Sequence, residues 1–233
     1  LLSSHSHHFS GDDGSTFRLN PEQVRYIGHS HGGEVGGLAL PFMGKYLKSA
    51  VLSGAGGALS ITLMERETGT DGLDLEVLIE NALSVEDHEI ISPFHPAIGL
   101  VQMLAEVTDP LNYARYWFQD QGYWRQSPLS ILMTEGLTDQ YTPPASIEIL
   151  AAAAGIPIIG EIHSKNPAQQ LLGLENGLIA NFNQVAFDHQ RVTAGLVQFP
   201  DDGHFPIFDN QEAVDLYRTF IQSATELNAT IAP

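Results

Sequence analysis

Short apolar runs alternate along the chain with segments in which apolar residues recur at helical spacing. Four such runs, at 24–28, 50–53, 130–135 and 196–199, end at glycine, proline or polar residues. Runs of this length and composition indicate short buried strands. Because strands that alternate with helices form mostly parallel sheets covered on both faces, the pattern predicts an α/β fold with helices flanking the sheet.

Helical spacing follows each of the four runs, and three of these segments are considered first. One helix is expected after Ser30, and an alanine-rich helix over 146–154 is followed by Gly155, which is placed to end it. The last helix is expected to begin at Asp209 as N-cap, with Glu212 three residues later, as in a capping box.

Residues 58–126 show helical patterns and no strand pattern. Helices are expected over 73–79 and 96–107, and aromatic residues crowd 113–124. We interpret 58–126 as a helical cap inserted into one domain. The aromatic residues suit either an acyl-chain pocket or packing of the cap onto the body of the domain.

The chain forms one domain over 20–233, preceded by a polar segment at 1–19. Its 233 residues suffice for a sizeable core, and 43% hydrophobic against 16% charged residues is typical of a folded protein. Residues 156–159 suit an extended segment, and the rest up to 190 reads as loop and short helix.

The formal net charge is −18, from 28 acidic and 10 basic residues. Such a surface repels nucleic acid and anionic membranes, so neither is an expected partner. The chain has no cysteine, which excludes disulfides, thiolate metal sites and cysteine catalysis. We expect no signal peptide in the polar opening and no membrane-spanning helix. Localisation stays open, with an extracytoplasmic or secreted bacterial protein slightly favoured.

The histidines His5, His7 and His8 are read as part of a mobile polar terminus and not as a metal site. No metal site and no cofactor are expected elsewhere in the chain.

The sequence Gly28-His29-Ser30-His31-Gly32-Gly33 is the main candidate for chemistry. A serine hydroxyl attacks carbonyl carbon only when a base removes its proton, so the chain must turn sharply and expose it. Glycines two residues before and after the serine permit such a turn between a strand and a helix. The alternative is a glycine-rich turn in which the serine is incidental.

With this motif the sequence resembles the α/β-hydrolase superfamily, and within it bacterial lipases and esterases. The resemblance covers about 22–55 and 128–222, and it implies a serine, an acid and a histidine in that order. The acid maps onto Asp139 after the run at 130–135, and the histidine onto His204 after the run at 196–199. The resemblance implies Ser30 as nucleophile, His204 as general base and acid, and Asp139 as the residue that orients it.

The backbone N–H of His31 is the implied oxyanion donor, and Gly28 and Gly32 are the implied glycines of the elbow. Taken alone, Asp139 also suits a turn and His204 a loop. Asp201 and Asp202 are alternatives for the acid, and we expect them to shape the loop instead.

Ser53 is an alternative nucleophile that lacks an elbow sequence. His29 and His31 are alternatives as metal ligands, although side chains that pack around the elbow are the favoured interpretation.

Only one strand is predicted before Ser30, whereas the resembled fold has several. A nucleophile strand without those neighbours would have an unpaired edge. We therefore expect the chain to lack the N-terminal strands of the fold, with the missing part in the same or a companion chain. The loop that supplies a second oxyanion donor is missing with them.

The expected function is cleavage of carboxylic esters, with a small-molecule or lipid ester as substrate. A serine peptidase of the prolyl-oligopeptidase type and a catalytically silent binding module on the same scaffold are the alternatives.

Overall fold

The computed structural model describes residues 8–18, 20, 23–43, 47–67, 92, 94–122, 127–174, 181–224 and 229–231. The helix predicted over 73–79 lies outside the described residues, as do His5 and His7.

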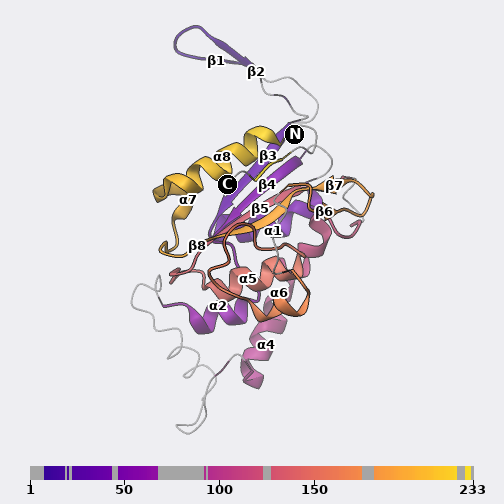
Figure 1. The fold of residues 1–233 in the computed structure, drawn as a ribbon, viewed down its shortest axis with the longest axis vertical. Coiled ribbons are helices and arrows are strands. Elements are labelled where there is room, and N and C mark those ends of the chain that lie inside the picture. The colour runs from indigo at the N-terminus through magenta and orange to yellow at the C-terminus, as the bar shows by residue number, and fades with distance from the viewer. Residues whose placement is uncertain are drawn as a thin grey trace.

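A four-stranded parallel sheet forms the centre of the molecule (Figure 1). Its strands are β3 (Val24–His29), β4 (Leu47–Ser53), β5 (Ser130–Gly136) and β8 (Ala194–Phe199), in the order β3-β4-β5-β8. Each contains one of the four predicted runs, and every adjacent pair is parallel. The predicted fold class, a mostly parallel sheet flanked by helices, is confirmed.

Helices cover both faces of this sheet, and alternate strand residues divide between them. Ile131 and Met133 of β5 pack in one core with α5 (Pro144–Ala153), while Leu132 packs in a second core with α8 (Gln211–Ser223). Because β5 is buried on both faces, it reads in the sequence as one continuous apolar run.

The helix α1 (His31–Ala39) packs on β3 and β4 and follows the strand that carries the serine motif. Its neighbour in the same core is Trp117, which is fully buried and donates a hydrogen bond from Nε1 to Gly37 O at 2.9 Å. Phe118 is buried beside it. Trp117 and Phe118 therefore pack the segment at 58–126 onto the body of the domain and do not line a pocket.

The remaining elements are short and surround the sheet. An antiparallel hairpin of β1 and β2 projects from the body (Figure 1), and the described parts of residues 58–126 contain helices but no strand. None of the described helices has the length and apolarity to span a membrane. The elements are β1 (His8–Ser10), β2 (Thr16–Arg18), η1 (Leu40–Phe42), α2 (Leu59–Glu65), α4 (Pro96–Ala105), η2 (Glu106–Thr108), η3 (Pro110–Asn112), η4 (Ala114–Trp117), α6 (Pro167–Leu171), β6 (Gln184–Val185), β7 (Arg191–Val192) and α7 (Pro206–Asp209).

The predicted helix over 96–107 is confirmed by α4 and η2. The predicted extended segment at 156–159 forms a single parallel bridge, from Ile158 to Leu196 of β8.

Strand β3 lies at one edge of the sheet and pairs with β4 alone among the described strands. Ile27 on this strand is 49% exposed and Val35 on α1 is 47% exposed, whereas the corresponding part of β4 is buried. The structure thus has the unpaired, apolar edge that the sequence predicted for a fold without its N-terminal strands.

The last helix begins differently from the prediction. Asp209 is the final residue of α7, and the N-cap of α8 is Asn210, whose Oδ1 accepts from the backbone N–H groups of Glu212 at 2.9 Å and Ala213 at 3.4 Å. The predicted cap at Asp209 is wrong by one residue because a short turn of helix intervenes before α8.

We predict that Asn210→Ala lowers the free energy of unfolding by about 1–2 kcal/mol, since it removes the cap of α8. Asp209→Ala is the matched control and should change it by less than about 0.5 kcal/mol. Urea unfolding of the two variants measures the difference. Equal losses would mean that the cap at Asn210 contributes little.

Candidate active site

The carboxyl ends of the four parallel strands lie at one edge of the sheet. Each strand is followed by a residue of the predicted site or by a residue that contacts it. Ser30 follows β3, Gly54 follows β4, Asp139 follows β5 and His204 follows β8. Parallel strands place these loops side by side, as in other open α/β sheets that bind ligands at this edge.

Ser30 occupies a backbone conformation that is unusual for a residue with a side chain. Its φ of 54° and ψ of −131° lie where glycine is favoured. The surroundings fix this conformation: Ser30 N donates to Ser53 O at 2.8 Å, while Ser30 O accepts from Gly33 N at 2.8 Å and Glu34 N at 3.1 Å. Strand β3 therefore turns at Ser30 directly into α1, as a nucleophile elbow requires.

Two glycines make this turn possible by allowing close approach of the backbone. A Cβ on Gly28 would lie 2.5 Å from Gly32 O, and one on Gly33 would lie 2.6 Å from the Cβ of Ala55. A Cβ on Gly32 would meet no atom within 4 Å. The sequence prediction paired Gly28 with Gly32, but of Gly32 and Gly33 the crowded position is Gly33, because that residue faces Ala55 after the end of β4.

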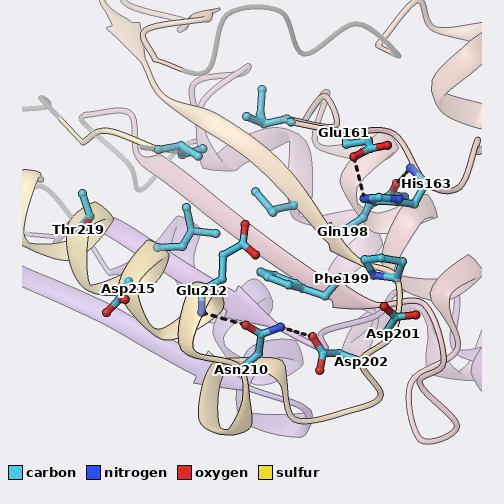
Figure 2. A pocket seen from close by; sticks show the side chains of 16 residues that line it. Glu161, His163, Gln198, Phe199, Asp201, Asp202, Asn210, Glu212, Asp215 and Thr219 are labelled. Carbon is cyan, nitrogen blue, oxygen red and sulfur yellow. Dashed lines mark hydrogen bonds and ion pairs between the residues drawn. The ribbon is translucent and has the colours of Figure 1, made fainter.

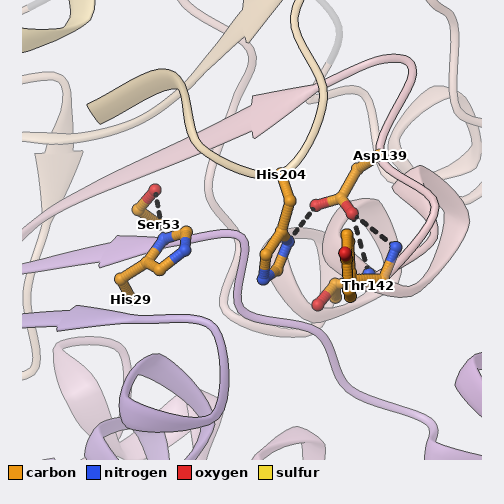
Figure 3. A network of polar contacts seen from close by, with 6 residues as sticks. His29, Ser53, Asp139, Thr142 and His204 are labelled. Atoms are coloured by element: carbon orange, nitrogen blue, oxygen red, sulfur yellow. Dashed lines mark hydrogen bonds and ion pairs between the residues drawn. The ribbon is translucent and has the colours of Figure 1, made fainter. Parts of the chain in front are cut away.

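Asp139 and His204 form a buried pair (Figure 3). His204 Nδ1 lies 2.7 Å from Asp139 Oδ2, and the two residues are 6% and 5% exposed. The other carboxylate oxygen, Oδ1, accepts from the backbone N–H groups of Tyr141 at 2.8 Å and Thr142 at 2.9 Å. Asp139 thus does both things that the sequence suggested, since one oxygen shapes a turn and the other orients the imidazole.

The imidazole of His204 lies over the end of β4. Gly54 has a φ of +54°, and a Cβ there would lie 3.3 Å from His204 Nδ1 and Cε1, so a side chain at this position would crowd the ring. The rings of Tyr141 and Phe205 contact the imidazole, with centroid separations of 5.0 and 4.9 Å. Gly54 and Tyr141 were not predicted as neighbours of the histidine, because no local pattern in either segment indicates a contact with His204.

Within the described part of the chain, Ser30 and His204 form no direct hydrogen bond with each other. Backbone contacts of Ser53 and Gly54 connect them instead. The Ser30 N–H binds Ser53 O, and Gly54, the next residue, contacts the imidazole. The ring of His29, the neighbour of Ser30, lies 4.7 Å from that of His204. The elbow and the buried pair therefore lie at the same edge of the sheet.

The two histidines beside Ser30 point in different directions. His31 is 86% exposed and its Nδ1 lies 3.2 Å from Glu34 Oε2. His29 turns inward, with Nδ1 3.3 Å from Ser53 Oγ (Figure 3) and its ring against those of Phe205 and Phe208. They do not converge on a shared metal ion, and no cluster of three metal-binding side chains occurs in the described part of the chain.

His29 is held in its neutral form. Burial, and then the neighbouring His204, lowers its pKa to about 4. At neutral pH the ring of His29 therefore adds no positive charge beside His204.

The alternative site residues make other contacts. Ser53 is fully buried, and its hydroxyl contacts His29. Asp202 shapes the loop before His204, since its backbone O accepts from Thr138 N at 3.0 Å and its carboxylate accepts from Asn210 Nδ2. Asp201 lines a cavity on the other side of that loop.

The backbone N–H of His31 stands at the first turn of α1 and donates no hydrogen bond to any described residue. The N-terminus of a helix favours negative charge. This donor thus has no hydrogen-bond acceptor within the described part of the chain.

A cavity of about 880 Å³ lies at the β8 edge of the sheet, between α8 and the segment after Ile159 (Figure 2). Carboxylates from Glu161, Asp201, Asp202, Glu212 and Asp215 line it, as does the ring of His163. Ser30, Asp139 and His204 do not line this cavity, so it is separate from the candidate active site.

No protein-family model matches the chain, and no curated protein matches it. Solved structures that resemble it include the acylaminoacyl peptidase of Pyrococcus horikoshii, with 12% identity over 92% of this chain and a TM-score of 0.47. An acetyl xylan esterase of Thermoanaerobacterium has 17% identity over 89% of this chain and a TM-score of 0.48. An esterase of Pyrococcus furiosus has 10% identity over 84% of this chain and a TM-score of 0.39.

The chain spans 25%, 47% and 51% of the lengths of these three proteins. The order of strand, elbow, acid loop and histidine loop along the parallel sheet is the order that the sequence predicted. At these identities the similarity to solved structures concerns the fold alone, a parallel sheet flanked by helices.

We predict that Gly28→Ala destabilises the protein by about 1–3 kcal/mol, because the new methyl group meets backbone that cannot move away. Gly32→Ala should be neutral or stabilise slightly, since its methyl group enters open space within a helix. Thermal unfolding of the two variants compares them. A larger loss in Gly32→Ala would contradict this packing of the elbow.

A second prediction concerns acid. Because the pKa of His29 is lowered on folding, the unfolded chain takes up a proton between mildly acidic and neutral pH that the folded protein does not. His29 should therefore reduce stability as the pH falls through this range. In His29→Phe this loss of stability should be smaller than in wild type. The midpoint of urea unfolding at neutral and at mildly acidic pH measures it. The control is His31→Phe at the exposed histidine, which should lose as much stability on acidification as wild type. If His29→Phe also loses as much stability as wild type, the lowered pKa of His29 is refuted.

Proposed function

We propose that the protein is a serine hydrolase that cleaves carboxylic esters of small molecules or lipids through an acyl-enzyme on Ser30. The observation that carries this proposal is the buried 2.7 Å contact of Asp139 with His204, at the sheet edge where Ser30 forms a strained elbow. His204 is the general base and acid, Asp139 orients it, and the His31 N–H is one oxyanion donor.

The proton chemistry follows from which imidazole nitrogen of His204 is hydrogen-bonded to Asp139. Asp139 holds Nδ1 as the protonated nitrogen, so Nε2 carries the lone pair that can accept a proton. Ser30 Oγ attacks the ester carbonyl as its proton passes to Nε2, and the imidazolium then protonates the leaving alcohol. Water then attacks the carbonyl carbon of the acyl-enzyme as its proton passes to His204, and the carboxylic acid leaves as the proton returns to Ser30 Oγ. Catalytic hydrogen bonds are often long before substrate binds, so a side-chain movement that brings Ser30 to Nε2 completes the site.

A further segment is part of this proposal. The unpaired edge of β3 and the exposed Ile27 support the pairing of additional strands there, from the same or a companion chain. Such a segment would also supply the second oxyanion donor, whose loss typically costs about 10²–10³ in rate.

We predict that Ser30→Ala abolishes labelling by a fluorophosphonate probe and hydrolysis of p-nitrophenyl acyl esters. Asp139→Asn and His204→Ala should each lower kcat by roughly 10³–10⁴-fold, since the imidazole loses its orientation or is removed. The control is Ser53→Ala, in which labelling should persist. If wild type with its complete sheet is not labelled, the protein is a binding module and not a hydrolase.

The same geometry can act on amides, so substrate preference needs its own comparison. We expect p-nitrophenyl acyl esters, which release p-nitrophenol, to be cleaved with higher kcat/KM than prolyl p-nitroanilides, which release p-nitroaniline. The reverse order would assign the protein to peptidases of the prolyl-oligopeptidase type.

A further inference from the structure

Aromatic rings lie around the imidazole of His204, and the proposed proton transfers use none of them. Asp139 bonds the imidazole on one side through Nδ1, and the ring of His29 lies on the other side, at a centroid separation of 4.7 Å (Figure 3). Phe205 and Phe208 pack on the ring of His29, with centroid separations of 5.4 and 4.9 Å. Both phenylalanines therefore lie on the His29 side of the imidazole, away from Asp139.

Tyr141 joins this group from the Asp139 loop. Its ring stacks on the imidazole at 5.0 Å, with an interplanar angle of 30°, and lies 6.0 Å from the ring of Phe205. Phe205 in turn meets the imidazole edge-on, at 4.9 Å and 77°. Offset-stacked and edge-on contacts at such separations are the arrangements that aromatic rings favour. The rings therefore form one connected group with the imidazole.

Three of these side chains are exposed although His204 is buried. Tyr141 is 37% exposed, Phe205 44% and Phe208 61%, whereas His204 is only 6% exposed. We call the three exposed side chains the aromatic patch. Apolar surface that is exposed in one place marks sites where ligands or partners bind. Because the patch borders the candidate active site, the substrate is the ligand that would cover it.

The proposed mechanism decides which part of an ester meets the aromatic patch. Nδ1 of His204 is bonded to Asp139, so the leaving oxygen must come within hydrogen-bond distance of Nε2 to take up its proton. The alcohol moiety is attached to that oxygen and therefore lies beside the imidazole. The acyl group stays on Ser30, with its carbonyl oxygen toward the backbone N–H of His31. The patch is accordingly placed for the alcohol and not for the acyl group.

The charges near the patch favour an uncharged alcohol. Arg66 Cζ lies 5.9 Å from the centroid of the Tyr141 ring, and this positive charge disfavours a cationic alcohol. The net charge of −18 disfavours an anionic one. All three side chains of the patch are aromatic, and a pair of aromatic rings gains more than an aliphatic group of equal buried area. An uncharged aromatic alcohol fits these conditions best.

We propose that Tyr141, Phe205 and Phe208 form the subsite for the alcohol moiety of the ester, and that this moiety is an uncharged aromatic alcohol. Its ring packs on the exposed faces of Phe205 and Phe208. When the bond between the acyl carbon and the alcohol oxygen breaks, the electron pair stays on that oxygen, which takes the proton from His204 Nε2. The alcohol then leaves from the patch. This inference rests on the proposed function, since it takes His204 as the acid that protonates the alcohol.

Acetate esters that differ only in their alcohol test the subsite. Benzyl acetate and cyclohexylmethyl acetate carry rings of similar size, of which only the first is aromatic. Wild type should cleave benzyl acetate with a kcat/KM roughly 2–10-fold higher, the contribution of an aromatic pair beyond its buried area. Because the intrinsic reactivity of the two esters is the same for every variant, a change in their kcat/KM ratio reports the patch.

Phe205→Leu and Phe208→Leu remove a ring but keep an apolar side chain. Each should lower the ratio of kcat/KM for benzyl acetate to that for cyclohexylmethyl acetate by roughly 2–10-fold. The matched control is Phe42→Leu, which removes a ring of 49% exposure from η1 and should leave the ratio unchanged. Equal losses on both esters in Phe205→Leu and Phe208→Leu would assign these rings a structural role and overturn the subsite.

Failure of the subsite is distinguishable from failure of the proposed function. Labelling of Ser30 by the fluorophosphonate probe without a preference for benzyl acetate would overturn the subsite and leave the hydrolase standing. A preference for acetylcholine over both esters would assign the patch to a cationic alcohol and overturn it as well.

Absence of both labelling and hydrolysis would refute the proposed function, and binding of benzyl alcohol then tests the patch by itself. Saturation-transfer NMR should show a signal for benzyl alcohol with wild type that Phe208→Leu lacks and Phe42→Leu retains. Equal signals with the three proteins would mean that the patch binds no aromatic ring.

Discussion

The hydrogen-bonded contact between His204 and Asp139 connects loops 65 residues apart in the sequence. It forms because β5 and β8 are parallel neighbours, so their carboxyl ends are adjacent. Both side chains are almost completely buried, and a charged carboxylate in such a place is stable only with strong hydrogen-bond partners. The two backbone N–H groups of the turn and the imidazole provide them. The loop geometry, the turn after β5 and the orientation of the histidine thus depend on one another.

The elbow of Ser30 depends on a different constraint, the space between β3, β4 and α1. Its strained backbone persists because the neighbouring backbone is bonded to it and because Gly28 and Gly33 leave room for close approach. The same compactness is absent on the outer side of β3, where apolar side chains are exposed. The edge of the sheet at the candidate site is therefore closely packed toward β4 and exposed on the outer side of β3.

Much of this arrangement could be predicted from the sequence, because buried parallel strands are continuous apolar runs and the elbow has a local signature. Other features depend on contacts between distant segments. The cap at Asn210 and the crowding at Gly33 are decided by a short intervening turn and by the approach of Ala55. Glu135 carries a signal of a buried polar contact: alternation places it on the same buried face of β5 as Ile131 and Met133, where an unpaired glutamate is unexpected. Its hydrogen-bond partner Gln198 comes from β8, a neighbour that the local sequence around Glu135 does not specify.

The central claim is that the imidazole of His204 serves the hydroxyl of Ser30. A crystal structure of the protein after reaction with a fluorophosphonate tests it most directly. The account predicts a covalent bond from Ser30 Oγ to phosphorus, with His204 Nε2 within hydrogen-bond distance of the adduct and Nδ1 still bonded to Asp139. An adduct on another residue, or an imidazole that stays out of reach of modified Ser30, would contradict it.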